Sequence, residues 1–288
     1  MRAMVPQQPN PPVVESPRPS RPRRFIRLRP WVQAAFLPVW MAPVAALRGV
    51  PSCVLHCYAC PLASASCPIG LAASAAALHL VPLLTIGVIL LVGSLVGSLV
   101  CGWVCPFGFV QDLFSRIPTP KFRLPAWTGL GRYLVLIGLV IVGPALFGKS
   151  TSNWAFICNL CPVGAAEAGL PRMISGQVPW SKLLNVKYVI LAALVVAMLF
   201  THRPWCRMLC PLGGVLALFN RFSVFHLRFD PSRCRVCNTC RSRCDMGVAV
   251  EREVNTAGCV RCLACTACGA LEPAVGRGMA SGTPSVKQ

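Results

Sequence analysis

The sequence has few charged residues and very few acidic ones. Only 12% of its 288 residues are Asp, Glu, Lys or Arg, against about 25% in an average soluble domain. No charged residue occurs between Arg48 and Asp112, and 55% of the chain is hydrophobic. A soluble fold of this size would rarely leave so long a stretch without a surface charge. The composition therefore predicts an all-α membrane protein with about four transmembrane helices.

Several common functional motifs are also absent. The sequence has no phosphate-binding Walker loop, no dinucleotide fingerprint and no hydrolase triad. It has only four histidines, and His79 at the edge of a predicted span has no obvious partner at equal depth for a haem. The net charge of +20 comes largely from arginines before the first span and in short loops. This placement predicts a basic rim against anionic lipid, with the lipid bilayer as a partner and no nucleic acid.

The apolar segments predict four spans and an orientation. Seven arginines precede Trp31, so the N-terminus is expected in the cytoplasm of a bacterial inner membrane, and an even number of spans returns the C-terminus there. Residues 1–30, rich in Pro and Arg, are predicted to form a disordered basic arm, and residues 273–288 a disordered tail. The predicted spans are Trp31–Arg48, Leu78–Val100, Leu130–Phe147 and Leu183–His202.

Eighteen cysteines are the second strong feature, and eight of them lie in a polar C-terminal segment. Their two runs have the close spacing of a bacterial ferredoxin, in which three cysteines hold one [4Fe-4S] cluster and the fourth reaches the other cluster. Residues 230–272 are therefore predicted to form a small ferredoxin-like domain with two [4Fe-4S] clusters, and zinc sites are the alternative. By the cross-over rule, one cluster would use Cys234, Cys237, Cys240 and Cys268, and the other Cys244, Cys259, Cys262 and Cys265. The second run departs from the pattern because two residues, not three, separate Cys265 from Cys268.

The preceding segment, residues 31–229, contains an internal repeat. CGWVCPFGFVQDLFSR matches CRMLCPLGGVLALFNR, and CYACPLASA matches CNLCPVGAA. Two parallel copies, residues 31–116 and 130–221, would each contribute two spans. Such a repeat would bring together one set of four thiols on the cytoplasmic side and a second set on the outer side. We predict these as candidate additional metal or cluster sites: Cys101, Cys105, Cys206 and Cys210, and Cys57, Cys60, Cys158 and Cys161.

Two further cysteines, Cys53 and Cys67, have no counterparts in the second copy. A disulfide between them is one hypothesis if they face an oxidising compartment. Packing without any ligand is the other explanation for the cysteines of the Cys-x3-Cys-Pro motifs.

The segments CGWVCPFGFVQDLF and CRMLCPLGG, the four predicted spans and the double cysteine run resemble the NapH/MauN-type membrane ferredoxins, over about residues 31 to 270. The resemblance implies a quinol dehydrogenase membrane subunit. Such a protein accepts electrons from membrane quinol and passes them through its clusters to partner redox proteins. The alternative is a metal-handling or maturation factor that uses thiols to reduce or deliver copper for a partner metalloenzyme.

Overall fold

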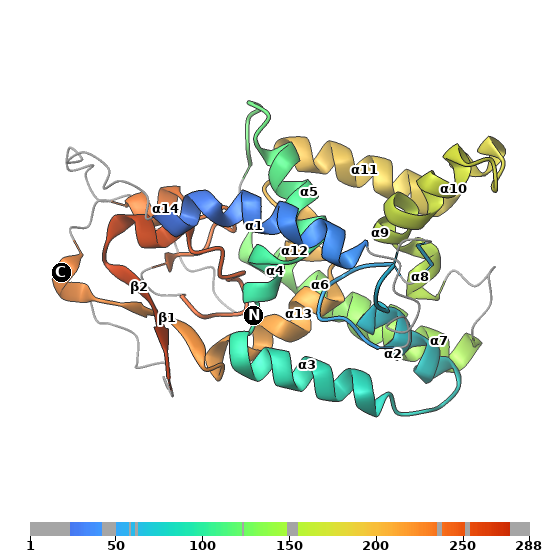
Figure 1. Cartoon of the computed structure of the whole chain (residues 1–288), viewed down its shortest axis with the longest axis horizontal. Helices are drawn as coiled ribbons and strands as arrows, with labels where there is room; N and C mark the ends of the chain where they lie inside the picture. The colour runs from blue at the N-terminus through green and yellow to red at the C-terminus, as the bar shows by residue number, and fades with distance from the viewer. Residues whose placement is uncertain are drawn as a thin grey trace, which may run out of the picture.

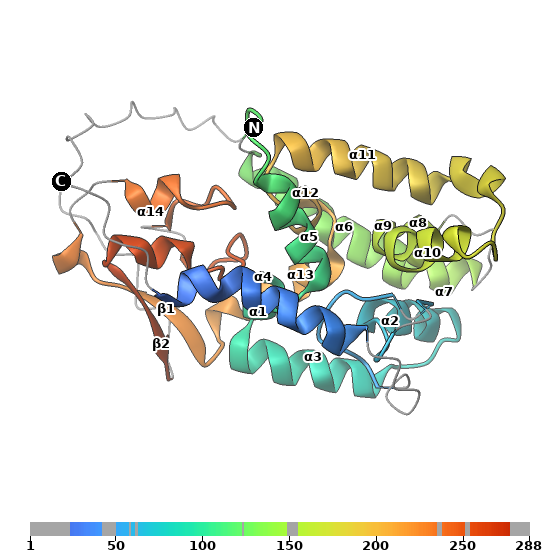
Figure 2. The same cartoon turned by 45° about the horizontal axis from the view of Figure 1, so that its top comes forward.

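The computed structural model describes residues 24–41, 50–57, 59–60, 63–122, 124–148, 155–234, 238–250 and 254–276, and this part of the chain is mostly helical. Helices α3 (Leu83–Val96) and α11 (Val186–Phe200) run along the long axis of the molecule in both views (Figures 1 and 2). The cysteine-rich C-terminal segment lies at one end of that axis.

The remaining helices of the first half begin with α1 (Arg24–Trp40) and α2 (Pro68–Ala77). After α3, the chain forms α4 (Leu99–Trp103) and α5 (Pro106–Ser115). A continuous helical stretch then joins η2 (Ala126–Leu130), α6 (Gly131–Val135), η3 (Leu136–Val142) and α7 (Gly143–Phe147).

The second half opens with α8 (Ile157–Leu160), α9 (Pro162–Gly164), η4 (Ala165–Gly169) and α10 (Leu170–Ile174). After η5 (Trp180–Leu184) and α11 come α12 (Pro204–Met208), α13 (Pro211–Leu218) and η6 (Phe219–Arg221). The C-terminal segment contains β1 (Phe225–Phe229), η7 (Pro231–Arg233), α14 (Thr239–Ser242), η8 (Ala264–Cys268) and β2 (Leu271–Val275).

One helix in the described residues, Trp127–Phe147, is long and apolar enough to cross a membrane. It coincides with the third predicted span. Helices α3 and α11 are equally apolar but shorter, at 14 and 15 residues, where a bilayer asks for about 20. Helix α3 begins at Leu83, five residues after the start of the predicted span at Leu78. The left-handed backbone of His79 (φ 54°) and Pro82, directly before the first turn, interrupt the helix there. The four-span architecture therefore stays a prediction.

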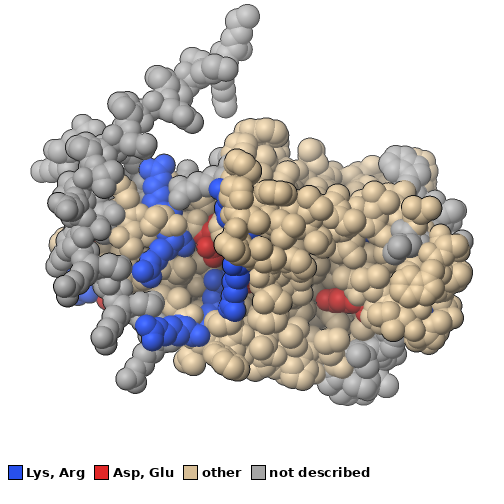
Figure 3. Space-filling view, turned by 90° about the horizontal axis from the view of Figure 1, so that it is seen from above, with Lys and Arg blue, Asp and Glu red and all other residues tan. Residues whose placement is uncertain are grey.

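Helices α3, α7 and α11 have exposed apolar side chains. Leu83 and Leu84 of α3, Leu146 of α7, and Val186 and Val189 of α11 are all exposed. Figure 3 shows Lys and Arg gathered over the half that contains the C-terminal segment, while the other half is almost uncharged on this face. Monomeric soluble proteins rarely expose apolar surfaces of this extent, so this half has the surface of a protein that contacts lipid or a partner.

Two predicted boundaries are corrected by the structure. Helix α1 begins at Arg24 and buries Arg29, so the last part of the segment predicted to be disordered is helical. The rest of that segment, and most of the predicted first span beyond Met41, lie outside the described residues. At the other end, β1 and β2 pair antiparallel, with Phe225 opposite Val275. The C-terminal unit therefore extends beyond residues 230–272 at both ends and includes a small sheet that the all-α prediction missed.

Candidate metal centres

The two cysteine runs of the C-terminal unit fold alike. Asn238 and Leu263 each follow the second cysteine of a run, and both have a left-handed backbone, with φ 54° and ψ 5° and with φ 63° and ψ 7°. A short helix follows in each case, α14 with Cys240 and η8 with Cys265. A left-handed residue is strained for Leu, so its presence at the same place in both runs marks a shared backbone turn. The backbone N–H of Arg261 donates to Cys259 Sγ at 3.4 Å, as expected around a sulfur-rich centre.

One predicted set of four cysteines lies together in the structure. Cys244, Cys259, Cys262 and Cys265 line a single apolar cavity. Its other walls include Leu227, Val248 and Val260. Burial raises the pKa of Cys259 to about 11 and also raises the pKa values of Cys244 and Cys265. The free thiols are therefore protonated at neutral pH, and any metal bound here must displace those protons.

The other tail set is described in part. The thiols of Cys240 and Cys268 are hydrogen-bonded, and this bond lowers the pKa of Cys268. Cys268, which departs from the ferredoxin spacing, thus reaches the first run. Cys234 is half-buried nearby in sequence, and Cys237 lies outside the described residues.

The C-terminal unit is fastened to the helical part at the carbonyl of Cys259. Ser98 Oγ donates to this oxygen at 2.7 Å, and Asn220 Nδ2 donates to it at 2.8 Å. Arg261 is fully buried, and its guanidinium donates to the carbonyls of Asn220 and Val96. Arg261 therefore lies inside the joint between the two parts.

The cysteines of the two Cys-x3-Cys-Pro motifs also lie together. Cys101, Cys105, Cys206 and Cys210 line a second apolar cavity. Cys53 lines it as a fifth thiol. Two donors point at the sulfurs: Gln111 Nε2 is 3.1 Å from Cys206 Sγ, and the backbone N–H of Gly213 is 3.3 Å from Cys210 Sγ. We call these five cysteines the central set.

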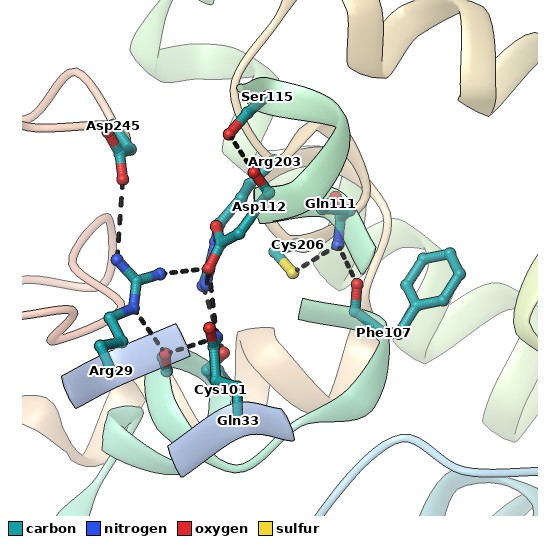
Figure 4. A network of polar contacts seen from close by, with 11 residues as sticks. Arg29, Gln33, Cys101, Phe107, Gln111, Asp112, Ser115, Arg203, Cys206 and Asp245 are labelled. Atoms are coloured by element: carbon teal, nitrogen blue, oxygen red, sulfur yellow. Dashed lines mark hydrogen bonds and ion pairs between the residues drawn. The ribbon is translucent and has the colours of Figure 1, made fainter. Parts of the chain in front are cut away.

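A buried ion-pair network adjoins the central set (Figure 4). Asp112 on α5 accepts from Arg203 Nε and Nη2, both at 2.6 Å, and from Arg29 Nη2 at 2.5 Å. Arg203 is 1% exposed, and its Nη1 also donates to the carbonyl of Cys101 at 3.1 Å. Burial by itself would raise the pKa of Asp112, but the two guanidinium groups and Gln33 lower it below its ordinary value. The network joins α1, α5 and the start of α12 beside the central cavity.

The structure describes the four predicted outer cysteines, Cys57, Cys60, Cys158 and Cys161, together with Cys67. Cys161 is close enough to interact electrostatically with Cys57, Cys67 and Cys158, and Cys57 interacts in the same way with Cys60 and Cys67. Cys60 packs against Ala63 and Ala168, and Cys57 packs against the same cluster. Cys53 and Cys67 are both free thiols, so the structure does not contain the disulfide between them that we had as a hypothesis.

The chemistry of these groups suits a thiophilic cluster. Each cavity offers several buried cysteines in an apolar surrounding, with N–H donors to sulfur, as iron–sulfur clusters require. Among the described residues, no three Cys, His, Asp or Glu side chains converge on one point as a single metal ion needs.

Sequence reasoning missed a polar pocket beside the tail cysteines. It is lined by Cys244, His202, Lys121, Arg207 and Asp245, among others. His202 Nδ1 is buried there without a hydrogen-bond partner. The loop between α5 and η2, the end of α11 and the C-terminal unit form its walls, so no local sequence signal could have revealed it.

A model of the 4Fe-4S binding domain family matches two segments of the chain, residues 78–125 and 187–230. The first contains Cys101 and Cys105, and the second contains Cys206 and Cys210, so both matches fall on the central set. The eight tail cysteines lie outside them.

Curated relatives include the uncharacterized protein MJ0749 of Methanocaldococcus jannaschii, 28% identical over 59% of this chain and 60% of that protein. The ferredoxin-type protein NapH of Haemophilus influenzae is 28% identical over 62% of this chain and 59% of its own. The methylamine utilization ferredoxin-type protein MauN of Methylobacillus flagellatus is 26% identical over 51% of this chain and 48% of its own length. The chain thus spans about half to three fifths of the length of these relatives. The predicted resemblance to NapH/MauN-type proteins is confirmed. No solved structure matches the chain.

Proposed function

We propose, from the similarity to ferredoxin-type proteins, that this chain is a membrane-bound iron–sulfur protein that passes electrons between quinol and partner redox proteins. One observation carries the proposal. Val260 lines both the cavity of the second tail set and the cavity of the central set. The two cavities therefore adjoin at this residue, and such proximity of two groups of cysteines is what a relay of one-electron carriers needs.

The tail cysteines and the central set would hold the clusters. Two [4Fe-4S] clusters are proposed in the C-terminal unit, with Cys268 completing the first run and Cys244 completing the second. A further cluster is proposed at Cys101, Cys105, Cys206 and Cys210, which the 4Fe-4S family model covers. When bound, such clusters supply one-electron redox chemistry. The chain's own part is to exclude water with apolar walls and to place N–H donors on the sulfurs.

A bacterial inner-membrane location is supported by the exposed apolar faces of α3, α7 and α11 and by the gathering of Lys and Arg at one end. We propose a multi-pass arrangement with both termini in the cytoplasm, where the C-terminal unit would meet soluble partners.

The polar pocket beside Cys244 is the proposed site for the quinol headgroup. The exposed Phe122 lines this pocket, and Trp127 is the first residue of the span-length helix. Aromatic side chains gather at membrane–water interfaces, so these two residues support a position of the pocket at such an interface. Oxidation of quinol releases two protons and two electrons. The unpartnered Nδ1 of His202 would accept one hydroxyl proton, and the second would pass to solvent from the pocket. The two electrons would leave one at a time through the cluster that Cys244 would help to hold.

The test uses the full chain, purified without oxygen in lipid nanodiscs. Adding a soluble quinol analogue should bleach the visible absorption of the clusters. His202→Ala should slow the bleaching by at least tenfold while the iron content stays unchanged. His226→Gln, which alters a histidine on β1 outside the pocket, is the matched control. Clusters that stay oxidised with every quinol tested and with an acceptor present would refute the quinol part.

Metal handling is the second candidate function, and the fifth thiol favours it. Cys53 exceeds the four ligands that one cluster needs, and soft thiolates bind copper(I) well. If copper handling is the function, Cys53→Ser should abolish copper(I) binding by the purified chain and leave quinol-dependent bleaching unchanged. If the wild-type protein binds no copper(I), metal handling is ruled out as its function.

A further inference from the structure

A buried network with one excess positive charge adjoins the central set. Arg203 donates to both carboxylate oxygens of Asp112, and Arg29 also donates to Oδ2 (Figure 4), so two guanidinium groups share one carboxylate. Arg203 and Arg29 are only 1% and 9% exposed, so water screens this charge poorly. A second carboxylate, Asp245, lies farther away, at 3.9 Å from Arg29 Nη1, and its side chain is 35% exposed. Its charge is therefore screened more strongly than those of the buried groups.

The network holds the backbone of the first Cys-x3-Cys-Pro motif. Arg203 Nη1 donates to the carbonyl of Cys101 at 3.1 Å. Arg29 Nε and Gln33 Nε2 both donate to the next carbonyl, that of Gly102, at 3.0 Å. Two consecutive carbonyls at a predicted ligand are thus bound by side chains that also bind Asp112, so the network and the ligand are mechanically one unit.

The guanidinium of Arg203 also lies next to the second cysteine of this motif. A Cβ placed on Gly108 would stand 3.6 Å from Cys105 Cβ and 3.7 Å from Arg203 Nη2. It would stand 2.9 Å from the carbonyl oxygen of Cys101, so a larger residue would push into the motif. In the chain, Arg203 directly precedes α12, which contains Cys206 of the other motif copy. Arg203 therefore adjoins predicted ligands from both copies.

Packing alone does not account for a buried arginine at this place. The backbone of Arg203 is left-handed, with φ 49° and ψ 52°, which is strained for a residue other than glycine. Apolar side chains in place of a buried ion pair are often neutral or stabilising. An anion bound in the adjoining cavity would account for the charge, because the excess positive charge would attract it.

We propose that this network raises the reduction potential of the cluster at the central set, which we call the central cluster. The inference rests on the proposed function, because it requires that cluster. Four thiolates outweigh the positive charge of an iron–sulfur core, so the bound cluster is an anion and each reduction makes it more negative. Net charge around a cluster is one of the factors that set its potential. The excess positive charge of the network thus favours the reduced state.

The midpoint potential of the central cluster should follow the charge of the network. Arg29→Gln removes one positive charge and leaves the pair of Arg203 and Asp112 whole, so it should lower the midpoint. Asp112→Asn removes the negative charge and should raise it. Arg203→Met should lower it, and the double variant with Asp112→Asn, which again has one excess positive charge, should return close to the wild-type value. Arg29→Lys keeps the charge and should also stay close to that value.

The measurement is a redox titration followed by EPR, with full-length protein in lipid nanodiscs prepared without oxygen and with iron per chain determined in parallel. The signal of the central cluster is the one that Cys206→Ser removes. Because the charges are buried, each single charge change should alter the equilibrium constant of reduction at least tenfold, about 59 mV for one electron. Lys187→Gln is the matched control. Lys187 lies in the first turn of α11, about 20 Å along that helix from the end that leads to Arg203, so its removal should leave the midpoint unchanged.

Opposite shifts for Arg29→Gln and Asp112→Asn support the proposal. Shifts in the same direction, as a distorted site would give, or an unchanged midpoint at wild-type iron content overturn it. If Asp112→Asn does not fold, the comparison of Arg29→Gln with Arg29→Lys decides, and equal midpoints in these two variants overturn the proposal. If Cys206→Ser removes neither iron nor any signal, the central cluster itself is refuted together with this inference. An unmoved midpoint of an existing cluster refutes this inference alone.

Discussion

Asp112 joins two buried arginines to the wall of the central cavity, so its charge should be essential to stability. Its carboxylate receives four hydrogen bonds, from Arg203 twice, from Arg29 and from Gln33. The side chains of Asp112 and Arg203 are only 17% and 1% exposed. Removing one partner of such a buried pair costs about 3–5 kcal/mol, because the remaining charge is left unpaired. We therefore expect Asp112→Asn to lower the free energy of unfolding by about that amount.

The measurement is unfolding in detergent micelles, followed by tryptophan fluorescence, with the iron content read in parallel. Arg203→Met in the Asp112→Asn background should recover part of the loss, since it removes the unpaired charge. Asp230→Asn is the control, because Asp230 pairs with Arg233 at an exposed site and should leave stability close to that of the wild type.

The pH dependence follows from the lowered pKa of Asp112. A carboxylate whose pKa is lowered in the folded state contributes stability above its unfolded pKa, about 3.9, and loses it as the pH falls through the folded value. The difference between wild type and Asp112→Asn should be full at neutral pH and should shrink below about pH 4. A difference below about 1 kcal/mol at pH 7, or an equal difference at pH 3 and pH 7, would refute the reasoning.

Two further substitutions probe the contacts around the clusters. Gly102→Ala places a Cβ 2.7 Å from the carbonyl oxygen of Val260, so it should cost about 1–3 kcal/mol and slow electron transfer between the tail and the central set. Gly87→Ala, with no atom within 4 Å, should do neither; equal effects of the two would contradict the packing argument. Gln111→Leu removes the donor to Cys206, so spectroelectrochemistry should show a lower reduction potential at unchanged iron content; an unchanged or higher potential would contradict this role.

The sequence predicted best where the chemistry depends on short spacing. Cys244 meets the second run, and Cys268 meets the first, because few residues connect ligands that share a centre. The repeat likewise predicted which thiols of the Cys-x3-Cys-Pro motifs would lie together, since equal elements place Cys101 and Cys206 at equivalent positions. These groupings come from local geometry and internal symmetry, which a single sequence contains.

The remaining features depend on contacts between distant segments. Cys53 reaches the central cavity through an irregular loop, and Asp112 meets arginines from two other elements, so no periodic pattern marks either. The break before α3 was missed because the left-handed turn at His79 interrupts an otherwise continuous apolar run.

The enclosed guanidinium of Arg261 has a mechanical consequence. It donates hydrogen bonds to the carbonyls of Asn220 and Val96 and is fully buried, so swinging the C-terminal unit away would break both bonds and uncover the charge. Where a mobile domain carries the redox centre, the rate of electron transfer is limited by the diffusion of that domain through solvent. Where the redox centres are fixed, the rate of electron transfer depends on the distance between them and on its energetics, and not on solvent viscosity. Raising the solvent viscosity with glycerol should therefore leave electron transfer within this chain unchanged and slow only its encounter with soluble partners.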